Sequence, residues 1–112
     1  MKKNEKSALI NFKINLDINN VPEKIIWNAS DVKKSNSEAK ALMVSIWDGD
    51  EKSSLNIDLW TKEMMAEEMN FFTFQIIDSL SRTYKKAVGN EKIAKEISDF
   101  AMHIGKTLHV LK

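Results

Sequence analysis

The chain has 112 residues, the length of a single domain; 43% are hydrophobic and 29% charged, as in ordinary soluble globular proteins. Its 17 basic and 16 acidic residues leave a net charge of +1, which argues against a dedicated nucleic-acid binder. Without cysteine, the sequence excludes disulfides, thiolate metal sites and thiol nucleophiles. We therefore expect one domain over residues 1–112, with residues 1–7 as a flexible tail, and neither a metal ion nor a cofactor.

The first half of the sequence alternates apolar and polar residues, with the two-residue period of a β-strand that buries one face. The clearest series runs from Ile10 to Ile18 and ends at the turn residues Asn19–Pro22. Further apolar series begin at Ile25, Leu42 and Leu55, and a polar stretch over 31–37 favours a loop. The pattern predicts strands over residues 8–18, 24–29, 40–48 and 54–60.

The last two predicted strands flank Asp48-Gly49-Asp50, which is typical of a hairpin turn. In an antiparallel hairpin the paired residue numbers have a constant sum, and paired side chains share a face. A sum of 101 and a sum of 99 both keep the apolar residues on one face, so the loop length stays open while the face predicted to be buried is fixed. With the sum of 101, the predicted pairs are Ile46 with Leu55, Val44 with Ile57, and Leu42 with Leu59.

After residue 62 the apolar residues recur at steps of three and four, which predicts helices over residues 63–88 and 91–110. Gly89 suits the C-cap of the first helix and Asn90 the N-cap of the second. Strands followed by helices predict an α+β domain: a four-stranded antiparallel sheet with a C-terminal antiparallel helical pair on one face. The second helical stripe comprises Ile93, Ile97, Phe100, Ile104, Leu108 and Leu111.

The apolar stripe of the first predicted helix is wider than one sheet contact requires, because Phe71, Phe74 and Ile77 flank its central row. Two interpretations stay open. The stripe is either buried between the sheet and the second helix, or it is a self-association surface. A homodimer is therefore a candidate assembly.

No residue constellation points to catalysis or metal binding. His103 and His109 are six positions apart, which places their rings about 120° apart around a helix and rules out a shared metal ion. The acidic turn at Asp48–Glu51 lacks the regular pattern of a calcium loop, and Asp58 belongs to the polar half of an alternating strand. Phosphate-binding loops and nucleophile elbows are also missing. We expect the protein not to be an enzyme.

The remaining candidate is a surface. Met43, Trp47 and Trp60 have the opposite parity to the core residues of their strands and should lie on the other face of the sheet, together with Ile26. Exposed tryptophan and methionine beside polar residues are typical of protein-binding sites. The competing interpretation packs Trp60 into a corner beneath the first helix and Trp47 within the hairpin.

Three blocks carry a resemblance to a known family: Val21–Trp27, Glu38–Asp48 and Ile57–Lys62, followed by the Glu67–Phe72 run. In order and spacing they resemble the gliding-motility-associated GldC family of the Bacteroidota. The resemblance implies a small cytoplasmic protein without known enzymatic activity. It also implies an accessory role in gliding, a process tied to type IX secretion, and it supplies no catalytic or ligand residues.

Together these observations predict a non-catalytic cytoplasmic accessory protein of the gliding apparatus that acts by binding other proteins, those of the gliding or secretion machinery. The sequence has neither a signal-peptide pattern nor an apolar stretch long enough to span a bilayer, so we expect no membrane insertion. The alternative is a chaperone-like holder of unfolded export substrates, because strands followed by two helices resemble the order in the SecB export chaperone.

Overall fold

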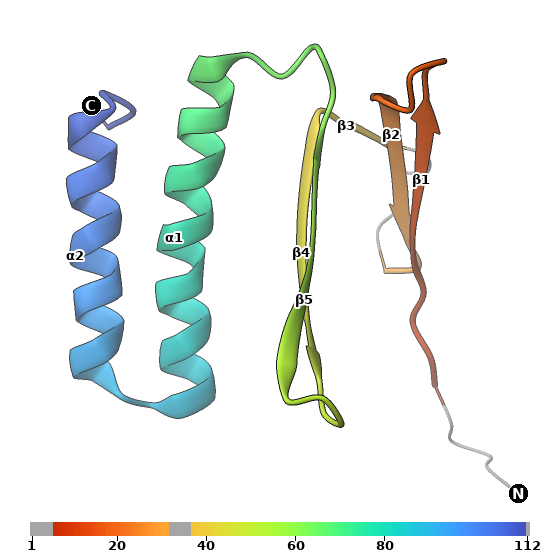
Figure 1. The fold of residues 1–112 in the computed structure, drawn as a ribbon. Coiled ribbons are helices and arrows are strands. Elements are labelled where there is room, and N and C mark those ends of the chain that lie inside the picture. Colours follow the sequence, from red (N-terminus) through yellow and green to blue (C-terminus); the bar gives the residue numbers. More distant parts are fainter. Residues whose placement is uncertain (1–5, 32–36, 112) are drawn as a thin grey trace, which may run out of the picture. The chain divides into compact units, whose positions relative to one another are not determined.

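The computed structural model describes residues 6–31 and 37–111 (Figure 1). It is an α+β protein that divides into two compact units, Met1–Met64 and Met65–Lys112, and each is described by itself. The predictions of one domain and of a helical pair packed on a sheet face stay predictions. The tail predicted over residues 1–7 lies mostly outside the described residues. The elements in chain order are β1 (Ile10–Leu16), β2 (Pro22–Ala29), β3 (Ser37–Ala39), β4 (Ala41–Asp48), β5 (Ser53–Trp60), α1 (Ala66–Val88) and α2 (Glu91–Thr107).

The first sheet is antiparallel and has the strand order β1-β2-β3. In it, β2 is the central strand, and Ile25 lies between Ile14 of β1 and Ala39 of β3. Ile25 is completely buried, whereas Phe12 on the edge strand β1 is 44% exposed. Ile25 is therefore the buried centre of this sheet, whereas the face that the alternating pattern predicted to be buried on the first strand is largely exposed within this unit, at Ile10 and Leu16 as well as Phe12.

The second sheet is the β4–β5 hairpin. Its register confirms the predicted sum of 101 and rejects the sum of 99. The turn has four residues, Gly49–Lys52; Lys52 adopts a left-handed conformation (φ 53°) and donates its N–H to the carbonyl oxygen of Asp48 at 2.8 Å. The observed pairs include Ile46 with Leu55, Val44 with Ile57, and Leu42 with Leu59.

The prediction of a single four-stranded sheet was wrong. The sequence pattern missed β3, which lies between the loop predicted over 31–37 and the strand predicted over 40–48. It pairs with β2 and precedes β4 by one residue, Lys40. The β2–β3 register aligns odd-numbered residues, Ile25 with Ala39, whereas the apolar residues of β4 are even-numbered. In one flat sheet the two apolar series would face opposite sides. The chain bends at Lys40 and continues into a second sheet, a common way to turn a sheet corner.

The bend is held by a residue that the sequence pattern did not single out. Thr61, directly after β5, is 4% exposed. Its N–H and its hydroxyl both donate to the carbonyl oxygen of Lys40, at 2.9 and 3.2 Å. This pair of bonds fixes the point where the chain leaves the first sheet for the second.

The end of α1 and the start of α2 lie as predicted, whereas α1 begins at Ala66, three residues after its predicted start at residue 63. Glu68 accepts the backbone N–H of Met65 and so caps the start of α1. Gly89 ends α1 in the left-handed conformation (φ 79°), and its N–H donates to Lys85. The side chain of Asn90 accepts the N–H of Ile93 and starts α2. The predicted C-cap and N-cap are both confirmed.

The interface between α1 and α2 is built from small residues, which the large-residue stripe predicted for α2 did not anticipate. On α2 the buried residues are Ala94, Ala101 and Gly105, whereas Ile93 and Phe100 are 36% and 53% exposed. From α1, the hydroxyl of the buried Ser81 donates to the carbonyl oxygen of Ala94 at 2.7 Å. Small side chains let two helices approach closely, so they take the contact face and the larger residues lie beside it.

The helix predicted to extend to residue 110 ends at Thr107. Val110 donates its N–H to Gly105, and His109 to Lys106, which together form the Schellman pattern of helix ends. His109 occupies the left-handed position (φ 58°) that glycine usually takes. The chain then turns back, and a β-carbon on Gly105 would lie 2.7 Å from Leu111 Cγ and 3.0 Å from Phe74 Cδ1.

Candidate functional site

Three of the four predicted binding residues lie on one face of the β4–β5 hairpin. Met43 and Trp47 of β4 and Trp60 of β5 share this face by register, and they are 44%, 68% and 57% exposed. Within the strand unit, Trp47 is not packed inside the hairpin. The interpretation of Trp60 as packed beneath the first helix involves the other unit and stays a prediction. Their role in binding stays a prediction.

A polar ladder separates the two tryptophans along the strands. The side-chain carbonyl oxygen of Asn56 accepts the hydroxyls of Ser45 and Ser54, at 2.8 and 3.0 Å. Trp47 lies opposite Ser54, and Trp60 opposite Ala41. Because Ala41 and Trp47 are six positions apart on β4, the tryptophan backbones are roughly 20 Å apart at about 3.3 Å per residue. Within one hairpin the face therefore holds two separate aromatic ends.

The fourth predicted residue, Ile26, lies in the other sheet. It is part of β2, half-buried, and pairs with Lys13 and Glu38. The register places it in a different ladder from Met43, so the structure does not bring all four residues onto one strand pair. The sequence argument placed it with Met43 because it assumed a single sheet.

Trp60 borders a small pocket of about 220 Å³. The walls are Val21 and Pro22 at the start of β2 and residues 58–60 of β5, so the turn before β2 lies beside the end of β5. Sequence reasoning did not foresee this meeting, because the two segments are far apart in the chain. The pocket gives Trp60 one apolar neighbourhood while more than half of its surface stays exposed.

The same turn is anchored by Asp17. One carboxylate oxygen accepts the N–H groups of Val21 and Asn19, at 3.0 and 2.8 Å, and the other pairs with Lys62 Nζ at 3.2 Å. The bond from Val21, followed by the Asn19 bond and the Lys62 charge, lowers the pKa of Asp17 below its ordinary value, although partial burial opposes this. The turn beside Trp60 is thus tied to the chain that follows β5.

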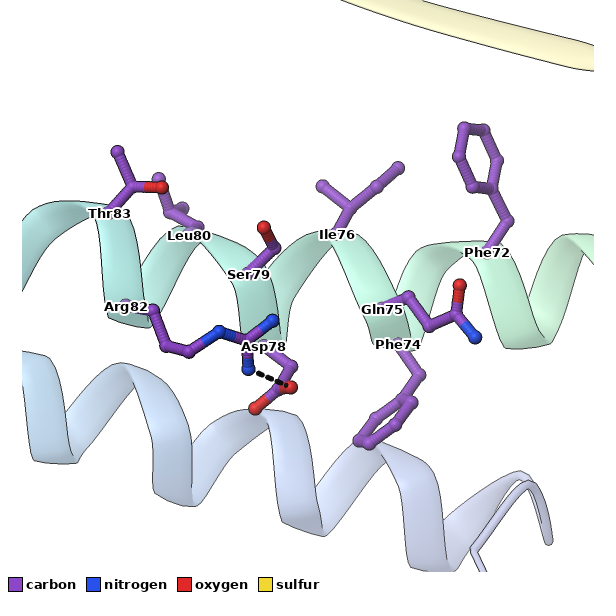
Figure 2. Close-up of a pocket in the computed structure, with 9 residues that line it drawn as sticks. All are labelled: Phe72, Phe74, Gln75, Ile76, Asp78, Ser79, Leu80, Arg82 and Thr83. Atoms are coloured by element: carbon purple, nitrogen blue, oxygen red, sulfur yellow. Dashed lines mark hydrogen bonds and ion pairs between the residues drawn. The ribbon is translucent and has the colours of Figure 1, made fainter. Parts of the chain in front are cut away.

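The helical unit carries a second apolar surface, on α1 (Figure 2). Phe72, Ile76 and Leu80 point away from α2, whereas Phe74 points toward it. Arg82 and Asp78 form an ion pair near α2. All residues that border this open pocket belong to α1, so within the helical unit it is one side of a helix and not an enclosed cavity. Whether the stripe is covered by the sheet or by a second copy stays a prediction.

No group in the described residues suggests chemistry. Asp58 is exposed on the polar side of β5, as predicted. His103 lies on α2 and His109 in the turn after it, both exposed. Across residues 6–31 and 37–111, the structure brings together no three histidine or acidic side chains able to hold a metal ion. In the same part of the chain, neither helix is long and apolar enough to cross a membrane.

The comparison with protein families matches residues 22–110 to the family described as "Gliding motility-associated protein GldC-like". The chain belongs to the GldC-like family. The match begins at the first residue of β2 and covers every later element, so of the strands and helices only β1 lies outside it. Neither curated proteins nor solved structures give a match. The family description associates the protein with gliding motility and names no reaction or ligand.

Proposed function

We propose that the protein is a non-catalytic accessory component of the gliding motility apparatus, acts in the cytoplasm, and works by binding other proteins of the gliding or secretion machinery. Membership of the GldC-like family supports the cellular process. The observation that carries the binding mode is the exposure of Trp47, 68%, on a strand face with Met43 and Trp60. Large aromatic side chains left in water are rare on monomers without a partner and dominate binding energy where a partner exists.

The two apolar ends of this face suit a protein ligand better than a small molecule. Trp47 is open on a hairpin, and the pocket beside Trp60 has a volume of about 220 Å³. Small-molecule sites usually enclose about 300–1,000 Å³. We infer that Trp47 and Trp60 are anchors on an extended surface and that the serine–asparagine ladder forms its polar part.

The test is a Trp47→Ala variant in a strain that lacks the chromosomal copy. We expect gliding to be lost while the variant accumulates to the normal level, because truncation of a largely exposed side chain costs little stability. Ile18→Ala is the matched control, since Ile18 is 95% exposed in the β1–β2 turn and should tolerate truncation with gliding intact.

Two results would contradict the proposal. Normal gliding with Trp47→Ala would show that this face binds nothing required. A fall of many degrees in the thermal midpoint of the purified variant would show that Trp47 belongs to the core and not to a binding surface.

The second candidate is the chaperone-like holder of unfolded export substrates. The exposed apolar residues on both faces of the β4–β5 hairpin favour it, because a holdase needs broad apolar surface. The two functions differ in how many kinds of protein the chain would bind. A holdase suppresses the aggregation of unrelated unfolded proteins at stoichiometric concentration, whereas a dedicated accessory protein does not.

A further inference from the structure

The outer edge of β5 is the feature that carries a further inference. In the described part of the chain, β5 pairs with β4 alone, and the second sheet has no other strand. No residue of the hairpin is buried: Leu55 and Ile57 are 58% and 41% exposed. A two-stranded ladder is marginally stable in water by itself; independent stability needs three or more strands with an apolar face, or packing against a helix.

The hydrogen-bonding pattern shows which backbone groups of β5 point outward. The Thr61 N–H donates to Lys40 O, and the register places these residues opposite each other, so they form a hydrogen-bonded pair. Such pairs recur at every second residue of an antiparallel ladder. Leu55, Ile57 and Leu59 therefore bond toward β4. The N–H and C=O groups of Ser54, Asn56, Asp58 and Trp60 point to the outer edge.

The residues of this edge lack the sequence devices that keep other strand edges from pairing. Natural edges carry lysine, proline or bulges, are very short, or are covered by a helix or loop. Strand β1 has Lys13 at its centre, and β3 has three residues. Strand β4 follows β3 after a single residue, and β3 already pairs with β2. By contrast, β5 has eight residues without proline or lysine, and Asp58 is its single charged residue.

We propose that two copies of the chain pair through their β5 edges, antiparallel, around a two-fold axis at Ile57. Only residues whose backbone N–H and C=O groups point to the outer edge can hydrogen-bond to the second copy, so they must lie opposite each other. Because they are every second residue of β5, the two-fold axis passes through a residue and not between two. An axis at Asp58 would place the two Asp58 carboxylates opposite each other. An axis at Asn56 would place the polar Ser53 opposite the apolar Leu59. At Ile57 it pairs Leu55 with Leu59 and Asn56 with Asp58, so apolar side chains meet and like charges do not.

This pairing turns two marginal hairpins into one four-stranded antiparallel sheet with a continuous apolar face. It also brings together the two aromatic ends that lie apart in one hairpin. Ser54 faces Trp60 of the second copy, and Trp47 lies on the other side of Ser54. The two tryptophans are then two strand spacings apart, about 10 Å. The self-pairing is argued independently of the proposed function. Only the statement that the joined surface is used for gliding rests on the proposed function.

The test uses Ile57→Cys in the full chain, which has no other cysteine. Opposite residues at the axis form a non-hydrogen-bonded pair with Cα atoms about 4.5 Å apart, within disulfide range. We expect mild oxidation to convert this variant into a covalent dimer. Leu55→Cys is the matched control: its sulfur would be four residues out of register with its copy, so we expect linking at least about tenfold slower.

A second measurement keeps the proposal open to refutation if the cysteine variant folds poorly. The solution mass of the unmodified chain should be that of two copies. Asp58→Pro removes one outward N–H and leaves the bonds to β4 intact, so it should give the mass of one copy. Asp58→Ala keeps the N–H and should give the mass of two.

Equal linking of both cysteine variants, or linking of neither, would overturn the proposal, as would an unmodified chain with the mass of one copy. An Asp58→Pro variant that stays dimeric would place the interface elsewhere. All of these measurements use the purified chain alone. A failure of self-pairing is therefore distinct from a failure of the proposed function, which is read from gliding in cells.

Discussion

The α1–α2 pair and the β4–β5 pair are both antiparallel hairpins, but they differ in how they are stabilised. The helical hairpin has its own buried interface, made of Ser81, Ala94, Ala101 and Gly105. The strand hairpin has an established register and no buried residue. A segment that exposes its apolar residues on both faces has a structure suited to a partner. The comparison therefore separates a pair with a buried interface of its own from a pair whose apolar residues no part of its own unit covers.

The largest expected effect breaks the helical side of this comparison. Gly105→Val places branched carbons where Leu111 Cγ and Phe74 Cδ1 already lie within 3.0 Å of a β-carbon. We expect a loss of about 2 kcal/mol in the free energy of unfolding, the range of overpacked cores, measured by denaturant titration of helical circular dichroism. Gly49→Ala is the control, because a β-carbon there meets no atom within 4 Å. An unchanged stability for Gly105→Val would contradict the tight helix contact.

The second effect concerns the corner that joins the two sheets. Thr61→Val keeps the shape of the side chain and the N–H bond to Lys40 but removes the hydroxyl bond. We expect a loss of about 1 kcal/mol, the net value of one hydrogen bond at a buried site. Thr83→Val on the exposed surface of α1 is the control and should change stability little. If the two variants are equally stable, the hydroxyl does not hold the bend.

A smaller effect, of opposite sign, is expected at a left-handed residue in each unit. His109 ends the helical unit and Lys52 closes the strand hairpin, with φ values of 58° and 53°. Glycine takes this conformation without steric cost, so His109→Gly and Lys52→Gly should each raise stability by about 0.5 kcal/mol in thermal unfolding. Asn20→Gly is the control, because asparagine already tolerates its φ of 63°. Destabilisation at either site would show that the removed side chain makes a contact that stabilises the fold by more than the left-handed backbone conformation costs.

The smallest effect depends on pH and belongs to the strand unit. Because folding lowers the pKa of Asp17, the carboxylate contributes stability above its unfolded pKa of about 3.9, and this contribution is lost as pH falls through the folded value. Asp17→Asn should therefore be less stable than the unmodified chain at pH 7, and the difference should disappear in strong acid. A difference that persists unchanged at low pH would mean that Asp17 acts through packing and not through its charge.

How far the sequence predicts this fold depends on the range of the interactions involved. Local patterns sufficed for the hairpin register, since Val44 and Ile57 must share a face, and for the caps at Gly89 and Asn90. The division into two sheets was missed because β3 is three residues long and weakly apolar, and its pairing with Ile25 depends on a distant strand.

The same reason explains what was missed at the candidate site. Parity placed Met43, Trp47 and Trp60 on one face, which the register supports. The distance between the two tryptophans also follows from the register once the pairs are known. The pocket of Val21 and Pro22 beside Trp60 and the bonds of Thr61 at Lys40 require tertiary contacts that no local pattern encodes.

The most direct measurement of whether β5 is an interface strand is amide hydrogen exchange in the unmodified chain. The N–H groups of Asn56 and Asp58 point away from β4, so β4 does not protect them, and protection that depends on protein concentration reports pairing with a second copy. We predict slow exchange at both positions, with protection that rises with protein concentration. Rapid exchange at Asn56 and Asp58 at all concentrations, beside protected Ile57, would contradict the account.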